Sequence, residues 1–255
     1  MHYINFDHVA EVYDSTRAIS SDLLNYYTKA IKGYLERNFS EPYKILSIGI
    51  GTGRTEGALH SLEIQLFGID ISLRMLKVLY NTKGRKEIGI AQADGCTIPF
   101  RGRFDLCIAT HVTHLIPNWA KLFSEIRRIS KTLVLGEIYT EVYTTPLFAY
   151  YKDFLNKKDW ERKSPGLRPK ELVELLEKEG YTIEKHKFSA EMKVSNAEIY
   201  DIIVNRYFSS FWRLPTNLHN QAIDALRSFI QEENISMETK NKVVGYCNLF
   251  FVPIC

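Results

Sequence analysis

The chain has 255 residues, of which 45% are hydrophobic and 25% charged, and its formal net charge at pH 7 is +3. This balance is typical of an ordinary globular protein with one large domain, and it excludes a disordered or fibrous chain. The charge is too mild to favour a nucleic-acid partner, and no apolar run approaches membrane-spanning length.

Cysteine usage and the start of the chain indicate a location. The four cysteines, Cys96, Cys107, Cys247 and Cys255, show neither a CxxC nor a zinc-ligand spacing, which favours a reducing compartment. The segment Met1–His8 has no apolar leader region. We therefore expect a cytoplasmic protein that does not enter a membrane. The sequence does not indicate an oligomeric state.

Helices are predicted over residues 1–40. Ser21 and Asp22 begin an amphipathic pattern that continues to about Arg37. Before it, Tyr13 and Arg17 are four residues apart and would share one face of a short helix. Without further signals, this first segment is equally well explained as a plain surface helix.

Strand and helix patterns alternate from residue 44 onward. The predicted elements, in chain order, are strand 44–49, helix 54–61, strand 64–69, helix 72–82, strands 87–91 and 104–109, helix 117–130 and strand 132–138. Such alternation is typical of a parallel sheet with helices on both faces.

The second half of the chain carries an insert between its last two predicted strands. A helical connector at about 145–162 and a helix at 170–179 lead to a strand at 181–188, and the last strand is predicted at 243–254. Between these strands, residues 195–235 have the pattern of two helices broken at Pro215. Connections in compact domains usually have about 4–6 residues, so we expect the insert to have a function.

The strand predicted at 44–49 runs directly into a turn with Gly49, Gly51 and Gly53. Glycine has no Cβ, so such a turn can adopt positive φ and a ligand can lie against its backbone. A helix that begins at the turn would direct unpaired N–H groups and a partial positive charge toward that ligand. We therefore expect a nucleoside-like cofactor at this turn.

Two acids follow the next two strands. Asp70 comes about 20 residues after the glycine turn, where nucleotide-binding α/β folds place a carboxylate on the ribose hydroxyls. Asp94, followed by Gly95, comes after the strand 87–91, where an acceptor could receive the exocyclic amine of an adenine. Both acids lie at carboxyl ends of strands, the edge at which open α/β sheets bind ligands.

Together these segments resemble the class I S-adenosylmethionine-dependent methyltransferases, in particular the small-molecule group known as type 11. The resemblance extends from about Phe6 to Glu137, and more loosely beyond. The segments that carry it are Ile48–Gly53, Gly68–Ser72 with Met75, Ala91–Gly95 before Ile98–Phe100, Phe104–Leu106 before His111 and His114, and Tyr13–Arg17. One departure is Ser47, because the family usually has an acid two residues before the first glycine.

The resemblance implies an α/β fold with a doubly wound, seven-stranded, mostly parallel sheet, the Rossmann-like methyltransferase fold, in a single domain over residues 1–255. It implies an enzyme that transfers a methyl group from S-adenosylmethionine to a small-molecule acceptor and leaves S-adenosylhomocysteine. The cofactor contacts that it implies are Tyr13, Arg17, Gly49, Gly51, Gly53, Asp70, Ile71, Met75, Asp94, Gly95 and Thr110.

In the resembled family, helices such as those at 195–235 often form a lid over the substrate pocket. Tyr207, Phe211 and Trp212 are therefore candidate contacts to the acceptor. The simpler explanation for each ring is that it packs the insert against the sheet.

His111 and His114 are the candidate catalytic residues. Methyl transfer is a direct displacement at a sulfonium, so a general base is needed only if the acceptor arrives protonated, and a histidine with a pKa near neutrality suits that task. Each histidine is equally well explained as a residue that hydrogen-bonds the backbone of its own loop. No third ligand has an obvious spacing, so no metal site is expected.

Three other functions are compatible with a glycine turn followed by two acids. A dinucleotide-binding dehydrogenase needs glycine or alanine three residues after the second glycine of its fingerprint, where this chain has Arg54 or Glu56, depending on the frame. A methyltransferase of the same fold could act on RNA or protein, and a scaffold could bind the cofactor without catalysis. The intact glycines and both acids disfavour a scaffold. The sequence identifies neither the acceptor nor whether O, N, S or C is methylated.

Overall fold

The computed structural model describes residues 6–17, 19–62, 64–82, 87–160 and 164–254. The chain divides into two compact units, which we describe separately. The sheet unit comprises Met1–Ile138, Pro165–Phe188 and Tyr246–Cys255, and the helical unit comprises Tyr139–Ser164 and Ser189–Gly245.

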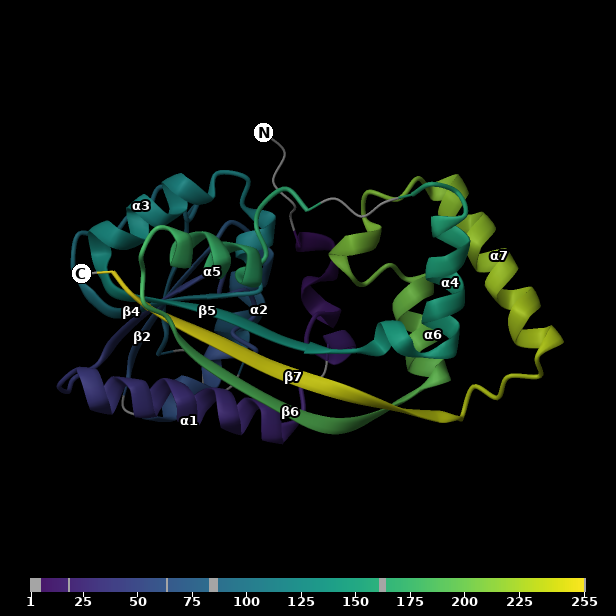
Figure 1. The fold of residues 1–255 in the computed structure, drawn as a ribbon, viewed down its shortest axis with the longest axis horizontal. Coiled ribbons are helices and arrows are strands. Elements are labelled where there is room, and N and C mark those ends of the chain that lie inside the picture. Colours follow the sequence, from purple (N-terminus) through teal and green to yellow (C-terminus); the bar gives the residue numbers. More distant parts are fainter. Residues whose placement is uncertain (1–5, 18, 63, 83–86, 161–163, 255) are drawn as a thin grey trace. The chain divides into compact units, whose positions relative to one another are not determined.

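Seven strands form one sheet in the order β3-β2-β1-β4-β5-β7-β6. Their bounds are β1 Lys44–Ile48, β2 Gln65–Asp70, β3 Gly89–Gln92, β4 Phe104–Thr110, β5 Ser130–Thr140, β6 Glu184–Ser195 and β7 Lys240–Pro253. The pairs β1–β2, β2–β3, β1–β4 and β4–β5 are parallel. The sheet thus confirms the predicted doubly wound, mostly parallel architecture, and its strand order reverses direction between β1 and β4 (Figure 1).

The α-helices are α1 Ser21–Asn38, α2 Leu73–Asn81, α3 Trp119–Ile129, α4 Pro146–Asn156, α5 Pro169–Lys178, α6 Asn196–Val204 and α7 Thr216–Glu232. The short 3₁₀ helices are η1 Asp7–Val12, η2 Ser15–Arg17, η3 Glu56–Leu62, η4 Thr113–Leu115, η5 Val142–Thr144 and η6 Ser209–Phe211. Helices α3 and α5 lie on one face of the sheet and α1 on the other (Figure 1). None of the helices in the described part of the chain combines the length and the apolar character needed to cross a membrane.

Local capping explains where three of these helices begin. Ser20, Ser72 and Asn118 precede α1, α2 and α3, and each side-chain oxygen accepts a hydrogen bond from the backbone N–H three residues later. Such a cap satisfies one of the N–H groups that a helix start leaves without an internal partner. Capping by Ser72 fixes the start of α2 directly after Asp70, at the edge where the strands end.

Two helices predicted from the sequence differ in the structure. The helix expected at 54–61 is the 3₁₀ helix η3, because Gly57 within the segment and the β-branched Thr55 before it both disfavour a regular α-helix. The short helix expected around Tyr13 and Arg17 consists of η1 and η2. Residues 1–5 and 18 of the predicted 1–40 helical region lie outside the described residues.

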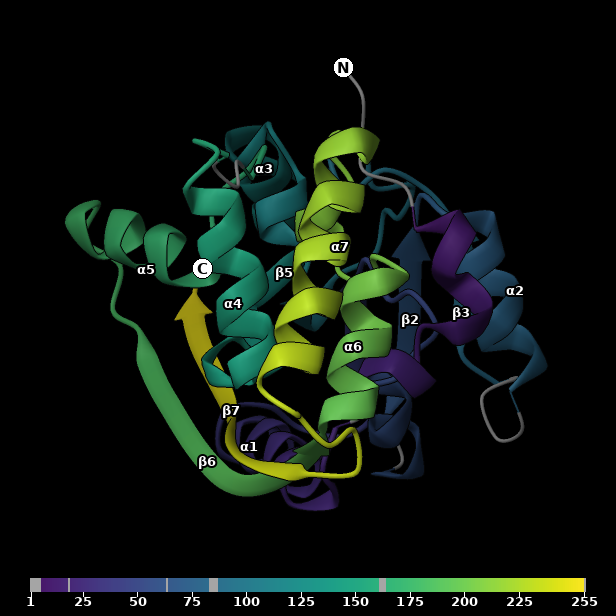
Figure 2. The same ribbon diagram turned by 90° about the vertical axis from the view of Figure 1, so that its right-hand side faces the viewer.

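The helical unit contains both helices of the predicted insert and one more. Helices α6 and α7 lie within 195–235 and are separated at Pro215, as predicted. Helix α4, which belongs to the predicted connector at 145–162, packs against both of them (Figure 2). Residues 161–163 of that connector are outside the described residues. A shared apolar core makes the three helices one compact unit.

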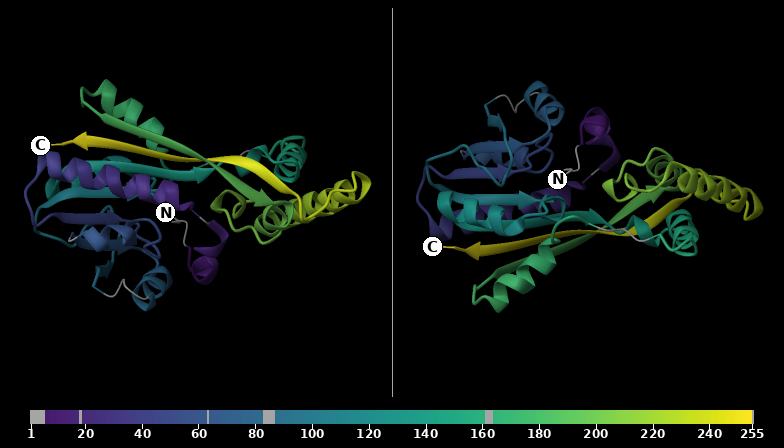
Figure 3. Two further views of the ribbon diagram at one scale, coloured as in Figure 1. Left: turned by 90° about the horizontal axis from the view of Figure 1, so that it is seen from below. Right: turned by 90° about the horizontal axis from the view of Figure 1, so that it is seen from above.

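The last two strands are longer than the sequence predicts. Strand β6 continues to Ser195 instead of ending near Phe188, and β7 begins at Lys240. They are neighbours in the sheet, and Figure 3 shows them as two long ribbons that cross in each view. Residues along β6 alternate in exposure, so the strand has one covered and one open face.

Candidate functional site

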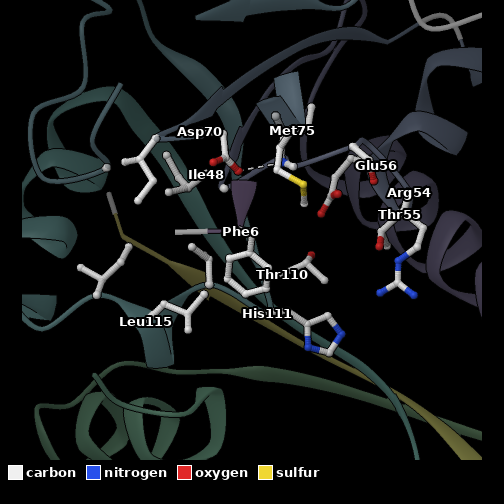
Figure 4. A pocket seen from close by; sticks show the side chains of 18 of the residues that line it. Phe6, Ile48, Arg54, Thr55, Glu56, Asp70, Met75, Thr110, His111 and Leu115 are labelled. Carbon is white, nitrogen blue, oxygen red and sulfur yellow. Dashed lines mark hydrogen bonds between the residues drawn. The ribbon is translucent and has the colours of Figure 1, made fainter. Parts of the chain in front are cut away.

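A pocket of about 890 Å³, open to solvent, lies in the sheet unit where β1 and β4 end (Figure 4). The place is the expected one, since open α/β sheets bind ligands where the strand order reverses. Predicted cofactor contacts that line the pocket are Tyr13, Gly49, Gly51, Asp70, Ile71, Met75, Asp94, Gly95 and Thr110.

The glycine turn forms the floor of the pocket at the end of β1. Gly49, Gly51 and Gly53 have φ of 66°, 57° and 70°, a left-handed conformation that glycine adopts at little cost. A Cβ added to Gly49 would lie 2.6 Å from Cγ2 of Val112, and one on Gly51 would lie 3.3 Å from Cε of Met75. The contact with Val112 excludes a larger residue at position 49, and the positive φ disfavours one at positions 51 and 53, so the backbone of the turn is bare.

Asp70 connects the turn with the start of α2. Its Oδ2 accepts a hydrogen bond from the Gly51 N–H at 2.9 Å, and its Oδ1 accepts one from the Ser72 N–H at 2.8 Å. Burial raises the pKa of Asp70 above the usual value for an aspartate, and the backbone N–H bonds oppose that rise. Each carboxylate oxygen has a second lone pair, so Asp70 can still accept hydrogen bonds from a ligand hydroxyl.

Asp94 lies in the loop after β3. Its Oδ1 accepts a hydrogen bond from the Cys96 N–H at 2.8 Å, which holds the loop that presents Asp94 and Gly95 to the pocket. Ile48 and Leu115 also line the pocket (Figure 4). Apolar walls beside a carboxylate suit a flat, largely apolar ring with a hydrogen-bond donor at its edge.

The N-terminal segment is tied to both the glycine turn and α2. The Thr52 hydroxyl donates to Oδ1 of Asp14 at 2.5 Å, and the Ser72 hydroxyl donates to Oδ1 of Asp7 at 2.5 Å. These bonds hold the segment in the place where Phe6 and Tyr13 line the pocket. The segment therefore contributes Phe6 and Tyr13 to the lining of the pocket, and its contact with a cofactor stays a prediction.

Tyr13 and Arg17 face the same way, although the local helix is not an α-helix. Cζ of Arg17 lies 4.3 Å from the centre of the Tyr13 ring, and Cζ of Arg54 lies 5.4 Å from it. Arg54 also donates through Nη1 to the backbone oxygen of Arg17. Arg54 lines the pocket, whereas Arg17 and Gly53, two predicted cofactor contacts, are not among its lining residues.

The two candidate catalytic histidines are in different surroundings. His111 lines the pocket and has a φ of 57°, and its Nε2 lies 2.8 Å from the backbone nitrogen of Ile138 and 2.7 Å from its oxygen. His114 is not among the described lining residues, and its backbone oxygen accepts from the Gly166 N–H at 3.0 Å. The structure therefore brings only the first of them to the pocket.

The pKa of His111 is lowered to about 3, first by burial and then by the nearby charge of Arg54. A buried imidazolium loses its hydration, and a neighbouring guanidinium repels it. The sequence predicts His111 as a general base, which requires a pKa near neutrality. The structure instead gives this histidine a pKa far below neutrality. His111 is a neutral imidazole at physiological pH.

This electrostatic environment predicts that His111 does not titrate between about pH 5 and pH 8. NMR of the labelled imidazole should show unchanged chemical shifts over that range, and a midpoint near 6.5 would contradict the prediction. Since the unfolded chain takes up this proton near its ordinary pKa and the folded chain does not, His111 should also reduce stability as the pH falls below about 6.5.

Glu56 is a pocket residue that sequence reasoning did not select. Its side chain is only 4% exposed, and Oε1 accepts a hydrogen bond from the Tyr27 hydroxyl at 3.1 Å. The same hydroxyl lies 3.3 Å from Oγ1 of Thr110. Burial raises the pKa of Glu56. From the sequence, Glu56 matters only because it does not fit the glycine fingerprint of a dehydrogenase. Its position three residues after the last glycine of the turn is the signal that could have identified it as a pocket residue.

The candidate acceptor contacts belong to the helical unit. Phe211 is 4% exposed and its ring centre lies 5.6 Å from that of Phe148 and 5.5 Å from that of Tyr151. The Trp212 indole donates to the backbone oxygen of Arg206 at 2.6 Å. Phe211 thus contributes to the core of this unit, and the acceptor contacts of all three aromatic residues, Tyr207 included, stay predictions. In the described part of the chain, no cluster of His, Cys, Asp or Glu suited to a metal ion occurs.

Comparison with known proteins gives one family and many similar folds. Residues 46–133 match the model of a family described as a methyltransferase domain, type 11. No curated protein sequence matches the chain significantly.

Solved structures share the fold at low identity. A protein from Anabaena variabilis, assigned as a methyltransferase of an antibiotic biosynthesis pathway, is 17% identical with a TM-score of 0.59 over 93% of this chain and 98% of its own. One from Bacillus halodurans, assigned as a methyltransferase, is 16% identical with a TM-score of 0.55 over 91% and 98%. Phosphoethanolamine N-methyltransferase 2 of Haemonchus contortus, with phosphomonomethylethanolamine and S-adenosylhomocysteine, is 18% identical with a TM-score of 0.52 over 97% of this chain and 57% of its own.

Proposed function

We propose that this S-adenosylmethionine-dependent methyltransferase, whose residues 46–133 match the type 11 methyltransferase domain, transfers the methyl group to a small organic acceptor. The observation that carries the proposal is the pocket at the ends of β1 and β4. It joins a bare glycine turn to Asp70 and Asp94 at one edge of the sheet.

Three features of the pocket fit the cofactor: the glycine turn, the two acids and the apolar walls. Gly49 and Gly51 line the pocket with backbone atoms alone, so a ligand can lie against the turn. Asp70 and Asp94 would hold the ribose hydroxyls and the adenine amine, with Ile48 among the apolar walls around the ring. When bound, the cofactor supplies a methyl group on a sulfonium.

The protein itself contributes positioning and a dry environment. Alignment of nucleophile, methyl and sulfur can supply several kcal/mol, and exclusion of water favours a step in which charge is cancelled. Phe6 and Tyr13 cover part of the pocket and would help to exclude water. Neutral His111 is a weak proton acceptor, so we propose an acceptor whose reacting atom needs no strong base.

Two observations support a small acceptor. The Haemonchus contortus relative was crystallised with a small phosphorylated amine, and the net charge of this chain is only +3. We further propose a cytoplasmic location, which the free and buried thiols of Cys96, Cys107 and Cys247 support because reducing compartments keep thiols unpaired.

Labelled methyl transfer tests the proposed function. The protein is incubated with S-adenosylmethionine that carries a radioactive methyl group and with a cell extract separated into small molecules and macromolecules. We expect a labelled product other than S-adenosylmethionine, separated from it by chromatography, in the small-molecule fraction only, and much less of it with Asp70→Ala. Label in RNA or protein would refute the acceptor class, and absence of transfer to either fraction would refute the activity.

The lid role of residues 195–235 is part of the same proposal. Lid elements should open locally before the sheet does, so their amide hydrogens should exchange quickly in the free protein and more slowly with cofactor product and acceptor analogue present. Hydrogen exchange measured by mass spectrometry checks this. Slow exchange in 195–235 that does not respond to ligands would contradict it and indicate a structural role for α6 and α7.

A further inference from the structure

Arg54 and Glu56 place opposite charges at one side of the pocket. Figure 4 shows both side chains, with Thr55, on the side away from Ile48 and Leu115. The two residues follow the glycine turn directly and are only two positions apart. This side of the pocket therefore offers a cation and an anion to the same ligand.

Glu56 is a buried carboxyl group that belongs to none of the ion pairs among the described residues. The hydroxyls of Tyr27 and Thr110 and the charge of Arg54 favour its ionised form, but burial outweighs them and raises its pKa. Burying a carboxylate is costly unless a positive charge accompanies it. A cationic group of a ligand in the pocket would remove that cost.

Arg54 has donor capacity that the protein leaves unused. One of its terminal nitrogens donates to the Arg17 backbone oxygen, and the guanidinium lies near the Tyr13 ring. Its Nε is buried and has no hydrogen-bond partner in the described part of the chain. A planar guanidinium held in this way is suited to a carboxylate, which can accept two parallel hydrogen bonds.

Position 47 does not supply the charge that the family usually has there. Ser47 is 1% exposed, is not among the lining residues, and its hydroxyl has no described hydrogen-bond partner. The methionine part of the cofactor carries both an ammonium and a carboxylate. A chain with serine at position 47 therefore needs another anion for the ammonium.

Resting on the proposed function, we propose that Glu56 binds the ammonium and Arg54 binds the carboxylate at the methionine end of the cofactor, so that Glu56 replaces the acid missing at position 47. Arg17, which the resemblance assigns to the cofactor, would then act through its backbone oxygen by holding Arg54. The pair makes the pocket selective for ligands that carry the complete amino-acid group.

Calorimetric binding of three ligands to four proteins tests this assignment. The ligands are S-adenosylhomocysteine, its decarboxylated analogue, and 5′-methylthioadenosine, which lacks the amino-acid group. The proteins are the unaltered chain, Glu56→Gln, Arg54→Gln and the matched control Tyr27→Phe, which keeps the Glu56 carboxylate but removes its phenol partner.

We expect Glu56→Gln to weaken S-adenosylhomocysteine binding by about tenfold or more and 5′-methylthioadenosine binding by less than about threefold, because only the first ligand has an ammonium. Arg54→Gln should weaken S-adenosylhomocysteine but leave the decarboxylated analogue nearly unchanged. Tyr27→Phe should change the affinity for S-adenosylhomocysteine far less than Glu56→Gln does.

Three results would overturn the assignment. Equal losses for S-adenosylhomocysteine and 5′-methylthioadenosine in Glu56→Gln would show a general effect on the pocket, and an equal loss in Tyr27→Phe would show a structural role for Glu56. If Glu56→Gln does not fold, the unaltered chain still tests the assignment. Equal affinity of the unaltered chain for S-adenosylhomocysteine and 5′-methylthioadenosine would refute the binding of the amino-acid group by Arg54 and Glu56. Failure of the unaltered chain to bind S-adenosylhomocysteine at all would refute the proposed function instead.

Discussion

Replacement of Asp70 by alanine is expected to weaken binding of S-adenosylmethionine and S-adenosylhomocysteine by about 2–4 kcal/mol, or roughly 30- to 900-fold. We propose that the carboxylate accepts from both ribose hydroxyls, and such charge-assisted bonds are the strong ones. Asp94→Ala should cost only about 1–2 kcal/mol, since it removes one hydrogen bond to the adenine amine. Calorimetry on each variant gives both values.

A 2′,3′-dideoxy analogue of S-adenosylhomocysteine separates two roles of Asp70. The carboxylate also accepts from the backbone N–H groups of Gly51 and Ser72, so its loss could loosen the turn. If Asp70 contacts the ribose, Asp70→Ala should affect the dideoxy analogue much less than the natural product. An equal loss for both ligands, or an unchanged affinity, would contradict the ribose contact.

Replacement of Gly49 by alanine is expected to destabilise the fold and to abolish measurable cofactor binding. A non-glycine residue at a φ of 66° costs about 1–2 kcal/mol. In addition, the new Cβ would lie 2.6 Å from a methyl carbon of Val112, so the loop after β4 must shift. Thermal unfolding should show a lower midpoint, and calorimetry should show no heat with S-adenosylhomocysteine.

Gly102 provides the matched control for this substitution. A Cβ added there has no heavy atom within 4 Å, and its φ is not in the left-handed region. Gly102→Ala should therefore leave the unfolding midpoint and cofactor affinity nearly unchanged. If Gly49→Ala behaved like Gly102→Ala, the close approach of ligand to the glycine turn would be refuted.

The sheet and the place of the pocket could be predicted from sequence because they depend on local patterns. Buried apolar runs such as Lys44–Ile48 identify strands, and three alternating glycines directly after a strand indicate a turn with positive φ. Asp70 is the last residue of β2 and Asp94 comes two residues after β3, so their presence at one edge of the sheet follows from the parallel topology. For these residues, the sequence pattern predicts where the residue lies in the sheet.

The charged side of the pocket could not be predicted in the same way. Arg54 and Glu56 follow the turn in a segment that looked helical, and only the 3₁₀ conformation of η3 and contacts with distant Tyr27 and Tyr13 define their surroundings. The pKa of His111 likewise depends on burial, which a local sequence does not show. Packing of α4 against α6 and α7 joins segments far apart in the chain.

Calorimetric titration with S-adenosylhomocysteine and, separately, with NAD distinguishes a methyltransferase pocket from a dinucleotide-binding one. The glycine turn, Asp70 and Asp94 together predict binding of the nucleoside product at roughly micromolar strength. Arg54 and Glu56 stand where a dinucleotide fingerprint needs glycine or alanine, so no binding of NAD is expected. Tight binding of NAD, with no response to S-adenosylhomocysteine or S-adenosylmethionine, would contradict the account.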